Sequence, residues 1–163
     1  AVQQVLGQEA TIKQTAQTYA DSESFFYIGR KAGYPVALES ALKLKEISYD
    51  HAEGFASGEL KHGPLALVTP ETPVIAILTA ESAAEKTLNN VKEVKSRGAP
   101  VIGVTSEPAH TSDVDQTFDV PDCGPLEPVV ANVALQLFAY YIADEKDRAI
   151  DKPRNLAKSV TVE

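Results

Sequence analysis

Apolar residues along the chain follow two alternating spacings, one typical of helices and the other of buried strands. Helical spacing predicts helices over residues 2–19, 35–48, 81–97 and 128–143. Short unbroken apolar runs predict strands over 25–28, 74–78, 101–104 and 118–120. The segment between the second helix and Gly63 is expected to be a glycine-rich turn, and 106–116 a polar loop.

Repeated alternation of strands and helices predicts an α/β fold, with a parallel sheet that helices cover on both faces. In such sheets ligands bind at the carboxyl ends of the strands. After Pro153 the sequence lacks helical spacing and is typical of extended chain. We therefore expect one domain over residues 1–150, followed by an extended tail over 151–163.

Composition limits the partners that the protein can take. At 163 residues, 44% of them hydrophobic and 23% charged, the chain suits a single globular domain. The net charge is −8 and no stretch is rich in Lys and Arg, which argues against nucleic acid as a partner. The same acidity would repel a phosphorylated substrate, so a sugar phosphate would need a local positive pocket or a helix N-terminus.

Cysteine content and the start of the chain bear on location and completeness. One cysteine, Cys123, excludes an internal disulfide and fits a reducing compartment. Neither a signal peptide nor an apolar run long enough to cross a bilayer is expected, so the predicted location is cytoplasmic, away from membranes. The sequence has no Met and opens at Ala1 in helix-like sequence, which favours a fragment of a longer protein over a small protein without its initiator Met.

The helix that begins near Pro35 carries the first candidate chemistry. A helical wheel groups Glu39, Lys43 and Glu46 on a narrow stripe beside the apolar face. The plainer interpretation is a solvated stripe with a Glu-to-Lys pair worth about 0.3 kcal/mol, and spacing alone favours it. The apolar face that should turn to the core comprises Val36, Ala37, Ser40, Ala41, Leu44 and Ile47.

Two further side chains are candidates on weaker grounds. His62 stands just before Gly63-Pro64, which fixes the chain direction after it, although a single loop histidine is usually incidental. Lys158 lies in the tail, where a lysine is usually solvated. It could act as a nucleophile only if burial or cationic neighbours lowered its pKa.

Metal and phosphate sites are not predicted. The three histidines have no helical i,i+4 spacing and the one cysteine is distant from them, which makes a metal site improbable. The glycines of 29–33 follow a strand but lack a dinucleotide-binding pattern. Glu81 after the second predicted strand would oppose a phosphate at the next helix, so this domain is not expected to hold the phosphate itself.

Three long motifs closely resemble the glucosamine-6-phosphate synthase family, the isomerizing glutamine–fructose-6-phosphate aminotransferases. They are Leu42–Tyr49, Gly58–Pro64 and Pro153–Glu163, in the same order as in the family. The resemblance covers essentially the whole chain as the second sugar-isomerase (SIS) domain plus the C-terminal tail. It implies a three-layer αβα domain with a parallel, flavodoxin-like sheet and a tail that closes the active site.

The resemblance also implies roles for particular residues. Glu46 matches the base that moves a proton between C1 and C2 of the open-chain sugar, and Lys158 matches the lysine that forms a Schiff base with fructose 6-phosphate. His62 matches the imidazole that assists ring opening in the partner subunit of a homodimer. Lys43 and Ala157 match residues that line the substrate site. No cofactor is implied.

The same resemblance leaves other functions open. The family's glutaminase domain and its first SIS domain, which binds the sugar phosphate, are missing from this sequence, so we expect the chain alone to bind substrate weakly and to turn over little or nothing. One alternative is a SIS module that binds sugar phosphates and regulates a partner. Another is a simple aldose–ketose isomerase, which needs no Schiff-base lysine.

Overall fold

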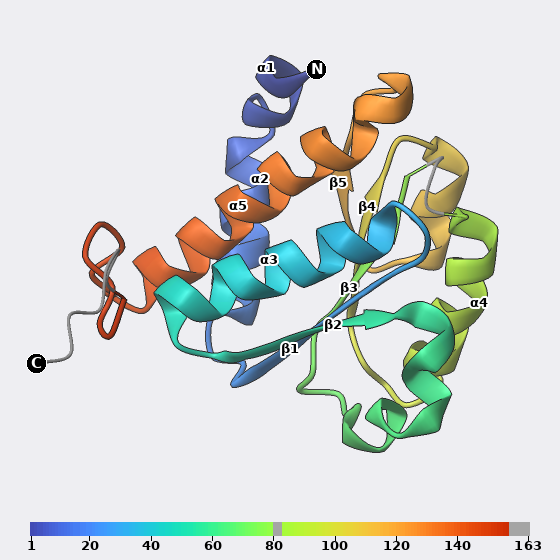
Figure 1. Cartoon of the computed structure of the whole chain (residues 1–163), viewed down its shortest axis with the longest axis horizontal. Coiled ribbons are helices and arrows are strands. Elements are labelled where there is room, and N and C mark those ends of the chain that lie inside the picture. Colours follow the sequence, from blue (N-terminus) through green and yellow to red (C-terminus); the bar gives the residue numbers. More distant parts are fainter. Residues whose placement is uncertain (80–82, 157–163) are drawn as a thin grey trace, which may run out of the picture.

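A five-stranded parallel sheet forms the centre of the protein (Figure 1). The computed structural model describes residues 1–79 and 83–156. The strands lie in the order β2-β1-β3-β4-β5, which is the flavodoxin-like order, so this part of the prediction is confirmed. They are β1 (Ser24–Gly29), β2 (His51–Ala56), β3 (Val74–Leu78), β4 (Val101–Thr105) and β5 (Gln116–Asp119).

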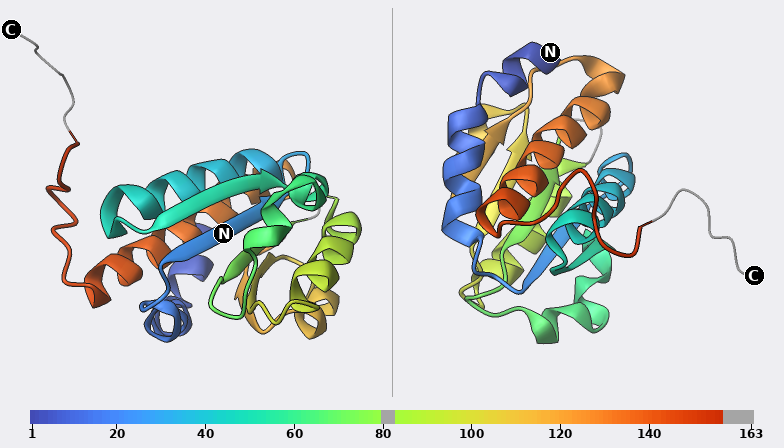
Figure 2. Two further views of the ribbon diagram at one scale, coloured as in Figure 1. Left: turned by 90° about the horizontal axis from the view of Figure 1, so that it is seen from below. Right: turned by 90° about the vertical axis from the view of Figure 1, so that its left-hand side faces the viewer.

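Helices cover both faces of the sheet and complete the predicted three layers. The α-helices are α1 (Val2–Leu6), α2 (Glu9–Tyr19), α3 (Gly33–Ser48), α4 (Ala84–Lys95) and α5 (Glu127–Glu145). On one face α2, α5 and α3 lie side by side, as the right-hand view of Figure 2 shows. On the other face α4 packs with the 3₁₀ helices η1 (Ser57–His62) and η2 (Pro64–Leu67). Within residues 1–79 and 83–156 two further 3₁₀ helices are η4 (Pro108–Asp113) and η5 (Gly124–Leu126).

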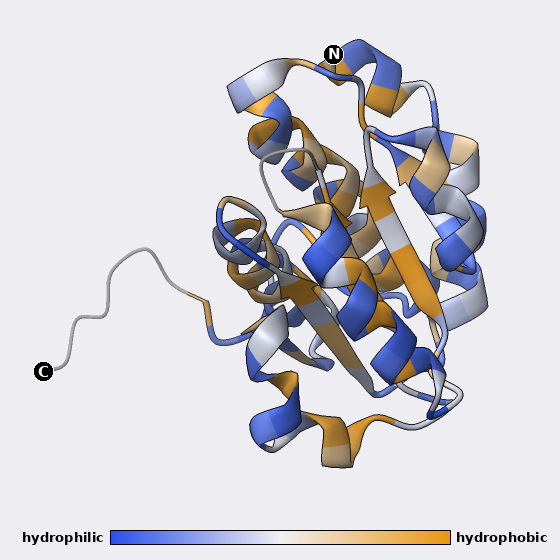
Figure 3. Cartoon of the chain, turned by 90° about the vertical axis from the view of Figure 1, so that its right-hand side faces the viewer, coloured by the Kyte–Doolittle hydropathy of each residue, from blue (hydrophilic) through white to orange (hydrophobic). Residues whose placement is uncertain are grey.

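Alternation within β1 explains the two cores. Phe25 and Tyr27 join the cluster under α3 and α5, whereas Phe26 and Ile28 join the cluster under α4. All four side chains are buried because successive residues of a strand point to opposite faces and both faces are covered. Figure 3 shows the polar side of α4 turned outward over the apolar strands.

The helix α5 is the most apolar element of its layer. Phe138 packs on Phe25 and Phe118, with ring centroids 6.2 and 5.7 Å apart. The sequence reading that no apolar run could cross a bilayer was wrong for Gly124–Glu145, which is long and apolar enough by length and composition. Its most apolar window is 56% buried inside the domain, as is typical of a core helix.

The predicted helix 2–19 is two helices, α1 and α2, broken at Gly7 and Gln8. The Gln8 side chain leaves the helical path and bonds both ways to the backbone of Asp119. Its Nε2 donates to the carbonyl oxygen at 2.6 Å and its Oε1 accepts from the amide at 2.8 Å. These bonds cover part of the open edge of β5, which would otherwise expose unpaired backbone groups.

The predicted glycine-rich turn after α3 contains the strand β2, and the prediction was wrong there. Among the described residues β2 pairs only with β1, which makes it an edge strand there. Its polar residues His51 and Glu53 interrupt the apolar run by which a buried strand is predicted. Gly54 is needed because a Cβ there would lie 2.8 Å from the Ala37 backbone. Glycine has a conformational reason at Gly98 as well, which follows the end of α4 with a φ of +82°.

Candidate functional site

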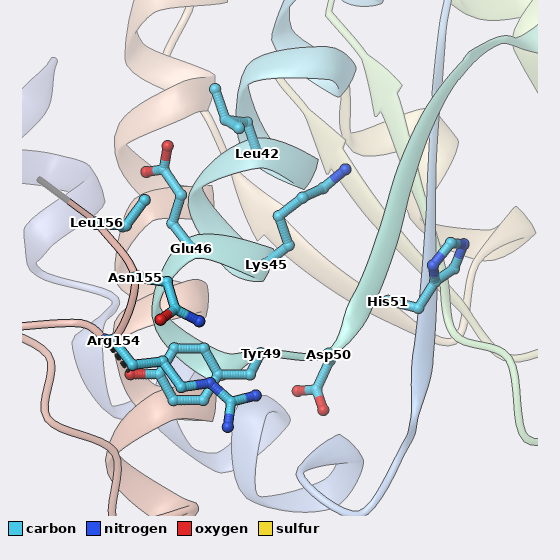
Figure 4. Close-up of a pocket in the computed structure, with 9 residues that line it drawn as sticks. All are labelled: Leu42, Lys45, Glu46, Tyr49, Asp50, His51, Arg154, Asn155 and Leu156. Atoms are coloured by element: carbon cyan, nitrogen blue, oxygen red, sulfur yellow. Dashed lines mark hydrogen bonds between the residues drawn. The ribbon is translucent and has the colours of Figure 1, made fainter. Parts of the chain in front are cut away.

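A cleft of about 590 Å³ lies between the last turn of α3 and the segment that precedes the C-terminus (Figure 4). Since α3 runs antiparallel to the strands, its last turn returns to the edge at which the strands begin, here named the amino edge. The residues that line the cleft are Leu42, Lys45, Glu46, Tyr49, Asp50, His51, Arg154, Asn155 and Leu156.

The apolar face of α3 fixes which side chains meet the cleft. The residues predicted to face the core are buried, with Ile47 partly so, and this prediction is confirmed. The helix ends where the Ser48 hydroxyl donates to the Leu44 carbonyl at 2.8 Å and accepts from the Asp50 amide at 3.3 Å. Of the stripe beside this face, Glu46 in the last turn of α3 lines the cleft.

Lys43 and Glu46 form the closest ion pair of the stripe, with Nζ and Oε2 2.6 Å apart. Glu39 is 4.0 Å from the same ammonium group. The hydrogen bond to Glu46, strengthened by both carboxylates, raises the pKa of Lys43 against a smaller opposing effect of burial. The Lys43 side chain is thus positively charged at neutral pH. A charged ammonium group can pair with the Glu46 carboxylate but cannot act as a nucleophile.

Figure 4 shows Glu46 on the side of α3 that faces the tail, next to Leu156. Lys45 points away from the tail in the same view. The Glu46 side chain is 25% exposed, so it reaches solvent and the cleft together. A carboxylate in this position can accept or return a proton on a bound molecule.

The segment 146–156, here named the return segment, is held to the end of α3 at several points. The Lys146 ammonium lies 2.6 Å from Asp50 Oδ1, and the two side chains are only 16% and 10% exposed. The Arg154 amide donates to the Tyr49 hydroxyl at 2.9 Å, while the Arg154 guanidinium lies 4.2 Å from the centre of the Tyr49 ring. The Arg148 guanidinium lies 5.4 Å from the same ring.

The structure does not bring His62 to Glu46. His62 is exposed at the end of η1, which follows the carboxyl end of β2. Glu46 precedes the start of β2, and the six residues of that strand alone span about 20 Å. Within one copy of the chain, Glu46 and His62 therefore lie near opposite ends of β2.

Lys158 and Ala157 lie outside the described residues. Leu156, the last residue described, lines the cleft beside Glu46. Lys158 follows two residues later in the sequence, a reach of about 7 Å for extended chain.

A second hollow, of about 430 Å³, lies at the carboxyl ends of β1 and β2, here named the carboxyl edge. Arg30, Lys31 and Lys86 line it together with Glu59. A Cβ at Gly58 would come within 2.6 Å of the Arg30 guanidinium, so a larger residue there would displace the end of that side chain. The sequence predicted a ligand at this edge from the fold class, yet Glu46 and the return segment stand at the opposite one.

Metal ligands do not gather in the described part of the chain. Over residues 1–79 and 83–156 no group of three or more His, Cys, Asp or Glu side chains could hold a metal ion.

Sequence reasoning gave no role to Tyr49, Asp50 and Arg154, although two of the three motifs contain Tyr49 and Arg154. The available signal was an aromatic residue at the end of a helix. Tyr49 has a φ of +70°, a left-handed conformation that glycine adopts far more readily.

Comparison with known proteins places these features in a family. A family model described as SIS domain matches residues 18–143. The glutamine–fructose-6-phosphate aminotransferase [isomerizing] of Halobacterium salinarum is 71% identical over 163 residues, which are 100% of this chain and 27% of that protein. The protein of the same name from Methanosarcina mazei is 54% identical over 99% of this chain and 27% of its own length.

A solved structure is similar over nearly the same extent. The C-terminal domain of glucosamine-fructose-6-phosphate aminotransferase from Francisella tularensis superimposes with a TM-score of 0.86 and 38% sequence identity. The match covers 93% of this chain and 43% of that one. The chain thus spans about a quarter of the length of the curated relatives that it matches.

Proposed function

This chain belongs to the SIS domain family, and we propose that it supplies one half of an isomerase and aminotransferase site that makes glucosamine 6-phosphate. The observation that carries the proposal is the cleft in which Glu46 stands beside Leu156, two residues before Lys158. The similarity to proteins named glutamine–fructose-6-phosphate aminotransferase, which extends over the whole chain, supports the choice of fructose 6-phosphate as substrate.

In the proposed reaction Lys158 acts first. Its neutral amine attacks C2 of open-chain fructose 6-phosphate, and loss of water leaves an iminium ion. Ammonia from glutamine adds to C2 of this iminium ion, and the Lys158 amine leaves, so that C2 now carries the imine of ammonia. The imine makes the C1 protons acidic, and the Glu46 carboxylate removes one of them to give an enaminol. Return of that proton to C2, with loss of the C1 hydroxyl proton, gives the 2-amino aldose.

Other groups complete the site in this proposal. Lys43 holds the Glu46 carboxylate in place by the 2.6 Å contact between Nζ and Oε2. His62, exposed at the far end of β2, assists ring opening in the site of a second copy of the chain, so the active form is a homodimer. The glutaminase and the first SIS domain come from elsewhere in the whole protein, which is cytoplasmic, and the tail 151–163 closes the site behind the 1–150 domain.

Borohydride trapping tests the proposal directly. The chain is mixed with the complementary first SIS domain and fructose 6-phosphate, and then treated with sodium borohydride, which reduces an iminium ion to a stable amine. Peptide mass spectrometry should find the adduct on Lys158. The matched control is Lys152→Arg, which changes another lysine of the same segment and should leave trapping intact, whereas Lys158→Arg should abolish it.

Other outcomes point to the other functions. Fructose 6-phosphate binding without any adduct on Lys158 would favour a SIS module that only binds sugar phosphates. Interconversion of aldose and ketose by Lys158→Arg at the wild-type rate would favour a simple isomerase. Steady-state synthesis by the 163-residue chain alone would contradict the proposal that it holds only half of the site.

A further inference from the structure

The end of α3 carries a residue that local backbone preferences disfavour. Tyr49 ends the helix with φ +70° and ψ 14°, and its amide still donates to the Lys45 carbonyl at 3.3 Å. For a bulky residue this left-handed conformation is an outlier, and glycine is the usual choice at such a helix end. A tyrosine kept here against that preference suggests that its side chain has a task.

The side chain of Tyr49 contacts the return segment through both its ring and its hydroxyl. The ring lies beside two guanidinium groups, at 4.2 Å for Arg154 and 5.4 Å for Arg148. The hydroxyl accepts the Arg154 amide at 2.9 Å. One aromatic residue therefore fixes the segment both at its start and directly before it enters the cleft, as Figure 4 shows for Arg154.

We propose that Tyr49 is a positioning residue, which sets the C-terminal tail in register with Glu46 so that Lys158 is delivered to the substrate. This inference rests on the proposed function, because it assigns to Tyr49 the placement of the lysine used there. The left-handed turn directs the ring toward the tail, one helical turn beyond Glu46. Only three residues stand between Arg154, whose amide is anchored, and Lys158, so the anchor limits how far that lysine can be from Tyr49.

Two variants separate the contributions of the ring and the hydroxyl. Tyr49→Phe removes the hydrogen bond and keeps the ring, so the amide of Arg154 should exchange its hydrogen about fivefold faster. Tyr49→Leu removes the ring as well, and trapping of fructose 6-phosphate on Lys158 should fall by about tenfold or more. Partial recovery in Tyr49→Phe relative to Tyr49→Leu is the pattern that a positioning role requires.

Matched controls come from the same helix and the same segment. Tyr34→Phe removes a hydroxyl at the opposite end of α3, and Lys152→Ala removes a tail cation that lies two residues before Arg154. Both should leave amide exchange at Arg154 and trapping on Lys158 unchanged. Arg154→Ala approaches the contact from the other side, without altering α3, and should reduce trapping as Tyr49→Leu does.

The outcomes distinguish the two proposals. If Tyr49→Leu and Arg154→Ala both trap fructose 6-phosphate on Lys158 as well as the wild type does, the role of Tyr49 is overturned and the proposed function stands. Absence of any Lys158 adduct in the wild-type chain with the first SIS domain would overturn the proposed function and this role with it. Slow exchange of the β1 amides in every variant shows that lost trapping does not come from unfolding.

Discussion

The two edges of the sheet carry different chemistry. At the carboxyl edge Arg30, Lys31 and Lys86 line a hollow with one acidic residue, Glu59. At the amino edge two acidic residues, Glu46 and Asp50, line the cleft together with Lys45, and the return segment forms its other side with Arg154. Ligands of doubly wound sheets bind at the carboxyl edge as a rule, since the strand ends and helix N-termini point there. Here Glu46, the carboxylate proposed to move the proton, stands at the end of a helix instead.

The proposed site therefore lies at the edge of the sheet opposite to the one that fold class predicts. A helix that is antiparallel to its strands carries its last turn to the amino edge, and only a second segment can convert that turn into a cleft. The return segment does so by binding Asp50 and Tyr49. The cleft therefore depends on contacts between residues about 100 positions apart in the sequence.

The largest effect should come from removing the carboxylate at the amino edge. Glu46→Gln keeps size and polarity but cannot accept a proton, so exchange of the C1 hydrogen of fructose 6-phosphate with D₂O should slow by about a thousandfold. The measurement is NMR of the sugar in the presence of the chain and the first SIS domain. The adduct on Lys158 should still form.

The carboxyl edge provides the control for that experiment. Glu59→Gln changes the acidic residue of the other hollow and should leave C1 exchange at the wild-type rate. Equal slowing by the two substitutions would contradict the assignment of the two edges, and so would wild-type exchange in Glu46→Gln.

The next effect concerns stability. Asp50→Asn leaves the largely buried Lys146 ammonium without its counter-charge, which should lower the free energy of unfolding by about 3 kcal/mol. At the carboxyl edge, Arg30→Gln removes a single hydrogen bond to Asn90 and should cost about 1 kcal/mol. Urea denaturation of the two variants measures both values. A cost for Asp50→Asn no larger than that for Arg30→Gln would show that the return segment contributes little to stability.

Much of the fold was predictable because buried strands and core helices have strong apolar patterns. Strand β3 was predicted with its observed bounds, and the burial of Val36 and Leu44 followed from the helical wheel. The strand β2 was missed because an edge strand with polar residues and Gly54 has no such pattern. Its glycine is explained only by the approach of α3, which is a tertiary contact.

Less of the site could be predicted from the residues alone. Spacing placed Lys43 and Glu46 together, and the 2.6 Å ion pair confirms that they interact, but spacing favoured a plain surface stripe. The roles of Glu46, His62 and Lys158 came from the resemblance and stay predictions. Tyr49 and Asp50 could not be found because their partners, Arg154 and Lys146, are remote in sequence.

A smaller effect compares backbone conformations at the two edges. Lys31 has a φ of +46° and Tyr49 a φ of +70°. Glycine at either position relieves the left-handed strain but adds flexibility to the unfolded chain, so Lys31→Gly should stabilise by about 0.5 kcal/mol. Tyr49→Gly also loses the ring and hydroxyl contacts, and should destabilise by about 1 kcal/mol. Thermal unfolding measures both, and stabilisation by Tyr49→Gly would contradict the contacts assigned to its side chain.

The smallest effect is the pH dependence of the Lys43 pair. The pKa of Lys43 is raised in the folded protein, so the folded state holds the ammonium proton of Lys43 more tightly than the unfolded chain does. The resulting stabilisation is fully present below the ordinary lysine pKa and is lost as pH rises through the folded pKa. Because the side chain is 34% exposed, solvent screening limits it to about 0.5 kcal/mol or less. Lys43→Met should therefore be slightly less stable than the wild type at neutral pH, and the difference should vanish in strongly alkaline solution.

Lys86→Met, at the carboxyl edge, is the control, since within residues 1–79 and 83–156 no carboxylate forms an ion pair with Lys86. A pH-independent difference for Lys43→Met would mean that its alkyl chain, and not its charge, supports Glu46.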